Sequence, residues 1–232
     1  WQTAARELAG IAVGGELVFS GICSHFSSSD DPDGSFAGVQ MERFRRVVAE
    51  CAERGLAIPF RHMSNSGAIR RAAEWDLDGV RPGILLYGYA RGPEARVVPA
   101  EPFLQWKTRL VQVKKVPPGS PVSYGGTHVT ARETWLGTLE AGYADGYSRS
   151  LSNKGVVLVG GRRCPVVGRV TMNMTVADLG PEPAAREGDE VVLIGSQGRE
   201  AVWADEMAGW RDTIAYEVLT NIVTDDRRAV CG

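Results

Sequence analysis

No run of apolar residues approaches the roughly 18 that a membrane span needs, and no signal-peptide pattern opens the chain. Charge of one sign is also lacking, because 26 Lys and Arg stand against 28 Asp and Glu. A formal net charge of −2 supplies no field that would hold a polyanion, which disfavours general nucleic-acid binding. No CxxC pair occurs, so the widely spaced cysteines are expected to be free thiols in a reducing compartment: Cys23, Cys51, Cys164 and Cys231. These absences predict a soluble, cytoplasmic protein.

The common sequence signatures of catalysis are missing as well. The chain contains no G-x-x-x-x-G-K-[ST], G-x-G-x-x-G, H-E-x-x-H or G-x-S-x-G motif. The acidic loop at residues 30–34 fails the ligand spacing of an EF-hand and is better explained as a solvated turn. His62 and His128 lack partners at metal-ligand spacing, so we expect both to be structural and expect no metal site.

The first part of the chain alternates helical and strand-like patterns. Residues 3–9 already follow a helical pattern, although no Met precedes them, so we expect a piece of a longer polypeptide. Residues 36–54 form a predicted helix with Met41, Phe44, Val47, Val48 and Cys51 on one face, ended by Gly55. The remaining predicted elements are strands at 17–23 and 58–63, a helix at 67–74, and a further strand and turn over 79–88. Such alternation predicts a parallel sheet covered by helices, either open or closed into a barrel.

Beyond Pro99 the sequence predicts mainly strands. Apolar and polar residues alternate from Leu104, and the apolar parity shifts at Val111 and Val113, which predicts a β-bulge or a bend. Further strands are expected at 135–139, 156–159, 164–167 and 190–194, and a helix whose stripe is Ile214, Val218, Leu219 and Ile222. The fold class is therefore α/β followed by an all-β domain.

Short polar segments follow several predicted strands. Ser64-Asn65-Ser66-Gly67 could hold an anion at a helix start, although taken alone it is more often a simple N-cap. The other segments are S-H-F at 24–26, R-P-G-I-L-L-Y-G at 81–88, S-Y-G-G-T at 123–127, G-Y-A-D-G-Y at 142–147, G-R-V-T-M at 168–172 and I-A-Y-E at 214–217.

Taken together and in order, these segments resemble the alanine racemases, enzymes that use pyridoxal 5′-phosphate (PLP) to interconvert L- and D-alanine. The resemblance covers nearly the whole chain. It implies the second half of a PLP-binding (β/α)8 barrel in residues 1–97 and a C-terminal β-domain in 98–232. It also implies a cytoplasmic homodimer that makes D-alanine for peptidoglycan. Each active site would combine the barrel mouth of one subunit with the β-domain of the other.

The resemblance also implies roles for individual residues. Tyr124 matches the catalytic base on one face of the substrate, and Met172 matches the position whose backbone N–H holds the substrate carboxylate. Arg81 matches the donor to the pyridine nitrogen of PLP. The other matches are Ser66, Gly83, Ile84 and Tyr216 in the phosphate cradle, His25 and Asn65 beside the ring, Tyr143 at the substrate, and Asp30, Arg149 and Arg169 with Tyr143 at the substrate entrance.

Several departures from the family pattern stand beside these matches. The family binds PLP covalently through a lysine near its N-terminus, whereas the four lysines here, Lys107, Lys114, Lys115 and Lys154, match no such motif. The first barrel strands, a phosphate-binding tyrosine and an arginine supporting the catalytic tyrosine are missing too. Asn173 stands where the family usually has aspartate.

The departures predict the C-terminal part of a racemase whose N-terminal part is a companion segment or was not included. Alternatives that remain open are a broad-specificity amino-acid racemase, a PLP decarboxylase of the same architecture, and a non-catalytic fragment.

Overall fold

The computed structural model describes residues 3–12, 17–89 and 100–223, and the predicted free thiol Cys231 lies outside them. The chain divides into two compact units, Trp1–Glu101 and Pro102–Gly232, each considered by itself. Within the described residues no helix has both the length and the apolar character that crossing a membrane requires.

The first unit alternates helices with short parallel strands. Strand β1 pairs in parallel with β2, with Ile22 opposite Arg61, and His62 makes a further parallel bridge to Gly79. This arrangement confirms the predicted strand–helix alternation and the parallel sense of the sheet. The elements are α1 (Ala4–Ala12), β1 (Ile22–Cys23), α2 (Ser35–Glu53), β2 (Arg61–His62), α3 (Ser66–Arg71) and the 3₁₀ helices η1 (Ala73–Trp75) and η2 (Ile84–Tyr87).

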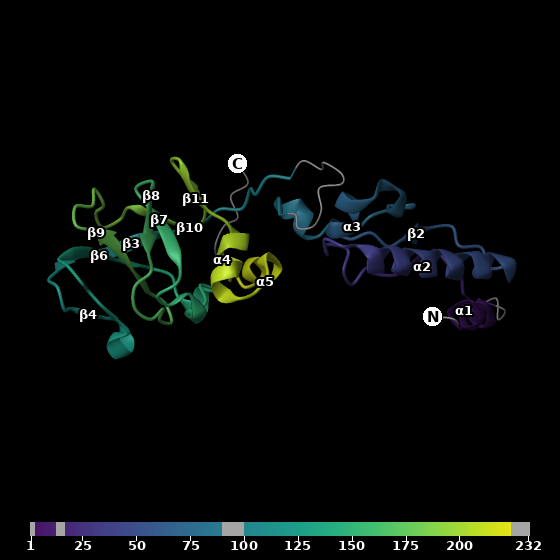
Figure 1. Ribbon diagram of the computed structural model, residues 1–232, viewed down its shortest axis with the longest axis horizontal. Helices are drawn as coiled ribbons and strands as arrows, with labels where there is room; N and C mark the ends of the chain where they lie inside the picture. The colour runs from purple at the N-terminus through teal and green to yellow at the C-terminus, as the bar shows by residue number, and fades with distance from the viewer. Residues whose placement is uncertain (1–2, 13–16, 90–99, 224–232) are drawn as a thin grey trace. The chain divides into compact units, whose positions relative to one another are not determined.

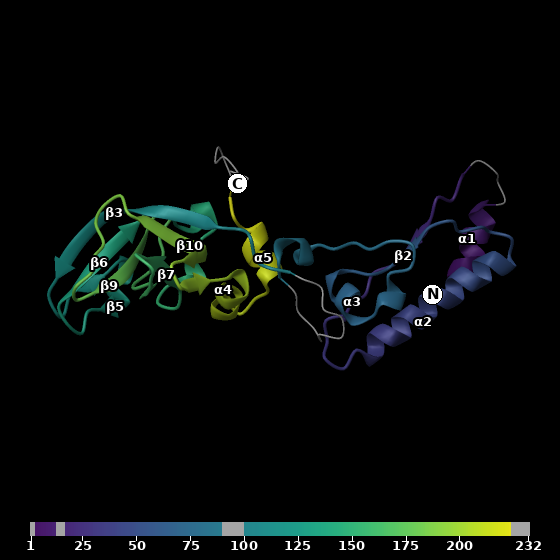
Figure 2. The ribbon, with the colours of Figure 1, turned by 90° about the horizontal axis from the view of Figure 1, so that it is seen from above.

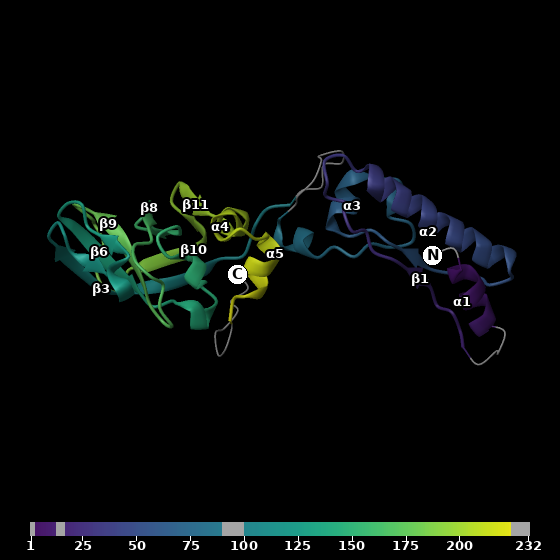
Figure 3. The ribbon, with the colours of Figure 1, turned by 60° about the horizontal axis from the view of Figure 1, so that its bottom comes forward.

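Helix α2 organises the core of this unit. Its predicted apolar face is buried at Met41, Phe44, Val47 and Cys51, whereas Val48 is only partly buried. Helix α1 packs beside it, with Ala5 in one cluster with Val47 and Cys51 (Figures 2 and 3). After the C-cap, Gly55 adopts φ of +79°, a left-handed conformation that glycine reaches without strain, so the predicted stop is confirmed.

All three predicted strands of this unit are shorter in the structure, and of residues 58–63 only Arg61–His62 form a strand, β2. Of residues 17–23 only β1 is a strand, and Leu17 and Val18 are exposed. Of the strand and turn predicted over 79–88, the strand is reduced to the single bridge at Gly79, and the chain then forms η2 and the turn at Gly88. Pro82 carries no N–H for a strand ladder, and the turn at Gly83 ends the extended backbone, which explains the difference.

The second unit is built around a seven-stranded antiparallel sheet in the order β8-β7-β10-β3-β6-β9, with β11 paired to β10 (Figure 1). β4 and β5 pair with each other as a separate antiparallel hairpin. The strands are β3 (Trp106–Val116), β4 (Pro121–Val122), β5 (His128–Val129), β6 (Thr134–Leu139), β7 (Val156–Val159), β8 (Arg162–Pro165), β9 (Thr175–Gly180), β10 (Glu190–Gln197) and β11 (Glu200–Val202). The helices are η3 (Tyr124–Gly126), η4 (Tyr143–Asp145), η5 (Arg149–Leu151), α4 (Ala204–Arg211) and α5 (Ala215–Thr220).

The predicted bulge lies in β3. The register of β3 against β6 shifts between Leu110 and Gln112, so the inward-facing side of the strand changes there. Leu110 is buried and Val111 is exposed, so Val111 continues the earlier alternation, and the inward side shifts only at the partly buried Val113. The core of this unit includes Leu158, Val192 and Val202 from three neighbouring strands.

Candidate functional site

Arg81 is the centre of a polar cluster in the first unit. Its Nη2 donates to the backbone oxygen of Ser24 (2.6 Å), and its Nη1 donates to the backbone oxygen of His62 (3.3 Å) and contacts that residue's Nδ1. Its own backbone N–H donates to Ser64 O (2.9 Å) and so extends the parallel ladder. Among the described residues Arg81 Nε donates no hydrogen bond.

His25 and Asn65 complete this cluster. His25 Nδ1 lies 3.3 Å from Arg81 Nη2, and His25 Nε2 lies 3.3 Å from Asn65 Nδ2. A neutral imidazole has one acceptor nitrogen, so His25 accepts from Arg81 or Asn65 and not from both. Asn65 Oδ1 accepts from Ser29 Oγ (2.6 Å) and from Ala68 N (3.1 Å), so Asn65 is also the N-cap of α3.

Ser66 and the 83–85 turn form a neighbouring cradle of donors. The buried Ser66 Oγ accepts from Gly83 N (3.0 Å) and from Leu85 N (3.2 Å). Its own proton has no acceptor in the part of the chain that the structure describes, nor does the N–H of Ile84, the first residue of η2. A side-chain carbon added at Gly83 would meet nothing within 4 Å, so the space beside these donors is open.

Tyr124 lies at the tip of the β4–β5 hairpin in the second unit. Its side chain is 74% exposed, and among the described residues no hydrogen bond holds its hydroxyl. Ser123, immediately before it, has φ of +60° and ψ of −173°, a backbone region nearly restricted to glycine that costs about 1–3 kcal/mol. A side-chain carbon added at Gly125 would lie 3.5 Å from Arg169 Nε, which places that guanidinium beside the tip.

The 142–145 turn and the 171–174 segment pack tightly against each other. Tyr143 N donates to Thr171 O (3.0 Å), and Ala144 N donates to Met172 O (2.9 Å). A Cβ at Gly142 would lie only 2.3 Å from Thr171 O, so only glycine fits this approach. The N–H of Met172 donates to no acceptor among the described residues and remains available.

The other predicted entrance and cradle residues divide between the units. Asp30 lies in the first unit, in a loop that Arg71 fastens by donating from Nε to Ser29 O (2.9 Å). Arg149 lies in η5 and Tyr216 in α5, both in the second unit. Tyr216 therefore belongs to a different unit from Ser66, Gly83 and Ile84, with which the sequence grouped it.

Two tyrosines of the second unit differ sharply in environment. Tyr147 is fully buried against Trp106, at 6.0 Å between ring centroids, and burial raises the pKa of its hydroxyl. The phenol of Tyr147 therefore stays protonated and cannot act as a base, whereas the exposed Tyr124 is accessible to a substrate.

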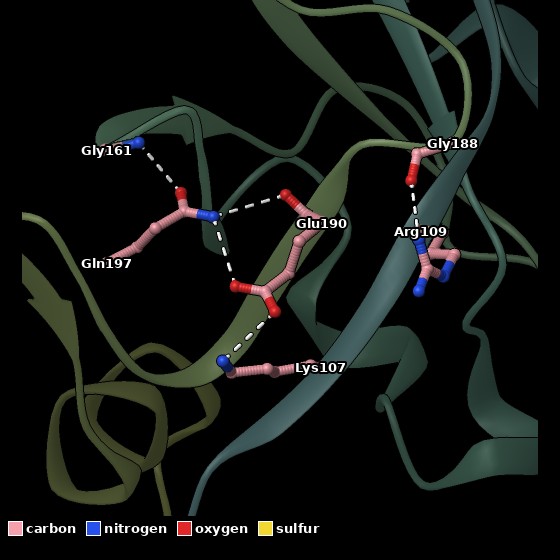
Figure 4. A network of polar contacts seen from close by, with 6 residues as sticks. All are labelled: Lys107, Arg109, Gly161, Gly188, Glu190 and Gln197. Atoms are coloured by element: carbon pink, nitrogen blue, oxygen red, sulfur yellow. Dashed lines mark hydrogen bonds and ion pairs between the residues drawn. The ribbon is translucent and has the colours of Figure 1, made fainter.

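The second unit contains a cavity of about 480 Å³ whose described lining does not include Tyr124. Its lining includes Lys107, Arg109 and Asn173. Figure 4 shows that Lys107 pairs with Glu190 (3.0 Å) and that Arg109 donates to Gly188 O (2.9 Å). Because these cations already have partners, we assign the cavity no part in the chemistry.

Three residues of the site had not been selected from the sequence. His62, expected to be only structural, contacts the guanidinium of Arg81, while Ser123 and Asn153 fasten the loops around Tyr124. Ser123 and Asn153 both have positive φ, a backbone conformation that the sequence alone did not indicate. No group of three metal-ligating side chains occurs within the described residues.

Comparison with protein families places both units. The model described as "Alanine racemase, N-terminal domain" matches residues 1–91, and "Alanine racemase, C-terminal domain" matches residues 103–230. The alanine racemase of Halothermothrix orenii is 45% identical over 207 residues, covering 89% of this chain and 55% of that protein. The alanine racemase of Carboxydothermus hydrogenoformans is 45% identical over 208 residues, covering 89% and 56%.

Solved structures agree with this placement. Alanine racemase from Streptomyces lavendulae, a D-cycloserine producer, matches with a TM-score of 0.89 at 36% identity, over 97% of this chain and 60% of that one. The Bartonella henselae enzyme, with covalently bound pyridoxal phosphate, matches with a TM-score of 0.81 at 30% identity, over 94% and 58%. The chain spans about half the length of the curated relatives it matches. Both the α/β-then-β fold class and the resemblance stated above are confirmed, and the chain belongs to the alanine racemase family.

Proposed function

We propose that these 232 residues are part of a PLP-dependent alanine racemase that interconverts L- and D-alanine, supplying D-alanine for peptidoglycan. The observation that carries the proposal is the cluster around Arg81 and Ser66, where Arg81 Nε and the Ser66 hydroxyl donate to no acceptor among the described residues. Residues 1–97 would belong to the barrel and 98–232 to the β-domain. The PLP-binding lysine would lie outside this sequence, on a companion segment.

The donors of the first unit fit the phosphate of PLP. The hydroxyl proton of Ser66 and the N–H of Ile84 have no acceptor among the described residues, and the space at Gly83 is open. Phosphate oxygens are strong acceptors and would satisfy both donors. Tyr216 would add its hydroxyl to the same phosphate.

Arg81 fits the pyridine nitrogen. Two backbone oxygens, Ser24 O and His62 O, hold the guanidinium, which leaves its Nε–H to donate. A guanidinium cannot give up its proton, so a ring nitrogen facing it stays unprotonated. His25 and Asn65 would border the ring. When bound, PLP supplies an electron sink for negative charge at the substrate Cα, and this arrangement weakens that sink. A weaker sink favours return of the proton to Cα over transamination.

Inversion at Cα requires removal of the proton on one face and its return on the other. Tyr124 would serve one face and the lysine of the companion segment the other. A phenol acts as a base near neutral pH only where a cation favours its phenolate. The resemblance gives that part to an arginine that this sequence does not contain.

The second unit would also hold the substrate and form its entrance. The unused N–H of Met172 would donate to the substrate carboxylate, with Tyr143 beside it. Asp30, Arg149 and Arg169 would line the entrance. The assembly we propose is a cytoplasmic homodimer in which each site combines the barrel of one subunit with the β-domain of the other.

The test uses the complete protein with PLP and the separate enantiomers of Ala, Ser, Lys and Arg. Chiral chromatography is expected to show interconversion of alanine, with much slower reaction of the other three. Comparable rates on all four would indicate a broad-specificity racemase, and release of CO2 would indicate a decarboxylase. If the complete protein binds PLP and reacts with no amino acid, the proposal is wrong and a non-catalytic role is favoured.

A further inference from the structure

The hairpin that carries Tyr124 is too small to fix its own tip. β4 and β5 have two residues each, and isolated two-stranded hairpins are at best marginally stable. The open end of the hairpin, away from its tip, is fastened by Thr130, whose Oγ1 donates to Pro117 O (2.8 Å) and accepts from Ser120 N (3.0 Å). Residues 123–127 lie beyond that anchor, so the position of the tip depends on contacts from elsewhere.

Asn153 supplies such a contact with both ends of its amide. Its Oδ1 accepts from Gly168 N (2.5 Å), and its Nδ2 donates to Thr127 Oγ1 (3.2 Å) and Thr127 O (3.4 Å). One side chain therefore joins the end of the Tyr124 tip to the turn at residue 168.

The start of the tip is fastened to the same turn. Ser123 Oγ donates to Arg169 O (2.7 Å), and a Cβ at Gly168 would lie 2.7 Å from Val122 O, so the two backbones are in close contact. Ser152, next to Asn153, accepts from Val170 N (3.0 Å) and donates to Arg149 O (2.5 Å). Residues 152–153 thus connect the segments that carry Arg149, Arg169 and Tyr124.

The backbone at this position restricts which residue can make the connection. Asn153 has φ of +59°, a left-handed conformation that asparagine adopts more readily than most residues other than glycine. Glycine would fit the backbone but has no side chain, and aspartate would keep the acceptor for Gly168 but lose the donor to Thr127. Asparagine combines the left-handed backbone, the acceptor for Gly168 N and the donor to Thr127.

We infer that Asn153 is a positioning residue for Tyr124, holding the hairpin tip against the 168–170 turn so that the phenol stays at the substrate. The inference rests on the proposed function. Because the Tyr124 hydroxyl has no hydrogen bond among the described residues, its place is set by the backbone of the tip. A displacement of about 1 Å in a reacting group costs about 100-fold in rate.

The test compares Asn153→Gly and Asn153→Asp in the complete PLP-loaded protein, with Asp212→Gly as matched control. Asp212 also has a left-handed backbone, with φ of +55°, and caps α4. We expect Asn153→Gly to lower kcat about 10- to 100-fold with a smaller change in KM. Asn153→Asp should fall between that variant and the wild type, and Asp212→Gly should remain near wild type.

Two further readouts separate positioning from a general loss of folded protein. With α-deuterated alanine, the isotope effect in Asn153→Gly should rise for the enantiomer whose hydrogen faces Tyr124 and not for the other. In the PLP-free protein, hydrogen–deuterium exchange over residues 121–129 should accelerate in Asn153→Gly but not in Asp212→Gly.

Wild-type kcat in Asn153→Gly, unchanged exchange over the hairpin, or an isotope effect that changes equally for both enantiomers would each overturn the inference. If the wild-type protein fails to racemise alanine, the proposed function fails instead. The exchange measurement, which needs neither PLP nor activity, still decides whether Asn153 holds the tip.

Discussion

At the residue scale, the account depends on one exposed phenol. Replacing Tyr124 by Phe in the complete enzyme removes the proposed base and leaves the cluster of Arg81 and Ser66 unchanged. We expect turnover to fall by several orders of magnitude while PLP remains bound. Steady-state racemisation together with the visible absorbance of the cofactor measures both effects.

The matched control for this variant is Tyr147→Phe. The Tyr147 hydroxyl is buried without a hydrogen-bond partner among the described residues, so its removal costs little. This control should racemise alanine within about twofold of wild type. Near-normal turnover in Tyr124→Phe would rule out the assignment of the base.

The sequence indicated the identities of the site residues better than the way they are held. Tyr124 and Arg81 stand in recognisable segments, whereas the contacts of Asn153 and His62 join residues distant along the chain. Hydrogen bonds across such separations leave no local pattern in a sequence. The roles assigned to the individual site residues stay predictions until variants are measured.

At the element scale, the contact between η4 and the 171–174 segment sets the position of Met172. In Gly142→Ala the new methyl would lie 2.3 Å from Thr171 O and 2.4 Å from Met172 O. We expect the free energy of unfolding to fall by about 1–3 kcal/mol and KM for alanine to rise as the Met172 N–H moves. Urea unfolding and steady-state kinetics measure these changes.

Gly209→Ala is the control for that substitution. Gly209 lies in α4, and a Cβ there meets nothing within 4 Å. Alanine should leave KM unchanged and stabilise the helix by about 0.5–1 kcal/mol. Equal effects of the two substitutions would contradict the packing argument at Gly142.

An ion pair makes the first unit sensitive to acid. Asp78 accepts from Arg61 Nε (2.7 Å) and from Arg61 N (2.8 Å), which lowers the pKa of the Asp78 carboxyl. In the unfolded chain an aspartate carboxyl has a pKa of about 3.9. The ion pair therefore contributes its full stabilisation of the folded state above that pH, and this contribution is lost as the pH falls through the lower pKa of the folded state. The pair holds the end of β2 to the segment that leads to Arg81.

Urea unfolding of wild type and Asp78→Asn between pH 6 and pH 2.5 measures this contribution. Wild type should be the more stable protein at pH 6, and the difference should shrink in acid. A difference that stays constant with pH would show that the carboxylate charge of Asp78 does not contribute.

At the scale of the whole molecule, the alternation of helices and strands and the later run of strands were sufficient to predict the fold class. The bulge in β3 could be predicted from the sequence because the alternation of apolar and polar residues along a strand indicates which face is buried, and that alternation changes near the bulge. The strand expected within 79–88 is reduced to one bridge at Gly79, because most of its apolar residues lie in the 3₁₀ helix η2 after Pro82. Periodicity over so short a run does not distinguish the two.

The central claim is that this chain supplies the Arg81, Ser66 and Tyr124 groups of a PLP site whose lysine lies on a segment outside these 232 residues. The most direct measurement is the absorbance spectrum of the complete protein before and after borohydride, followed by mass spectrometry of its peptides. The account predicts a visible band that borohydride removes, with PLP then fixed to a lysine outside this sequence. Absence of the band, or PLP fixed to Lys107, Lys114, Lys115 or Lys154, would contradict it.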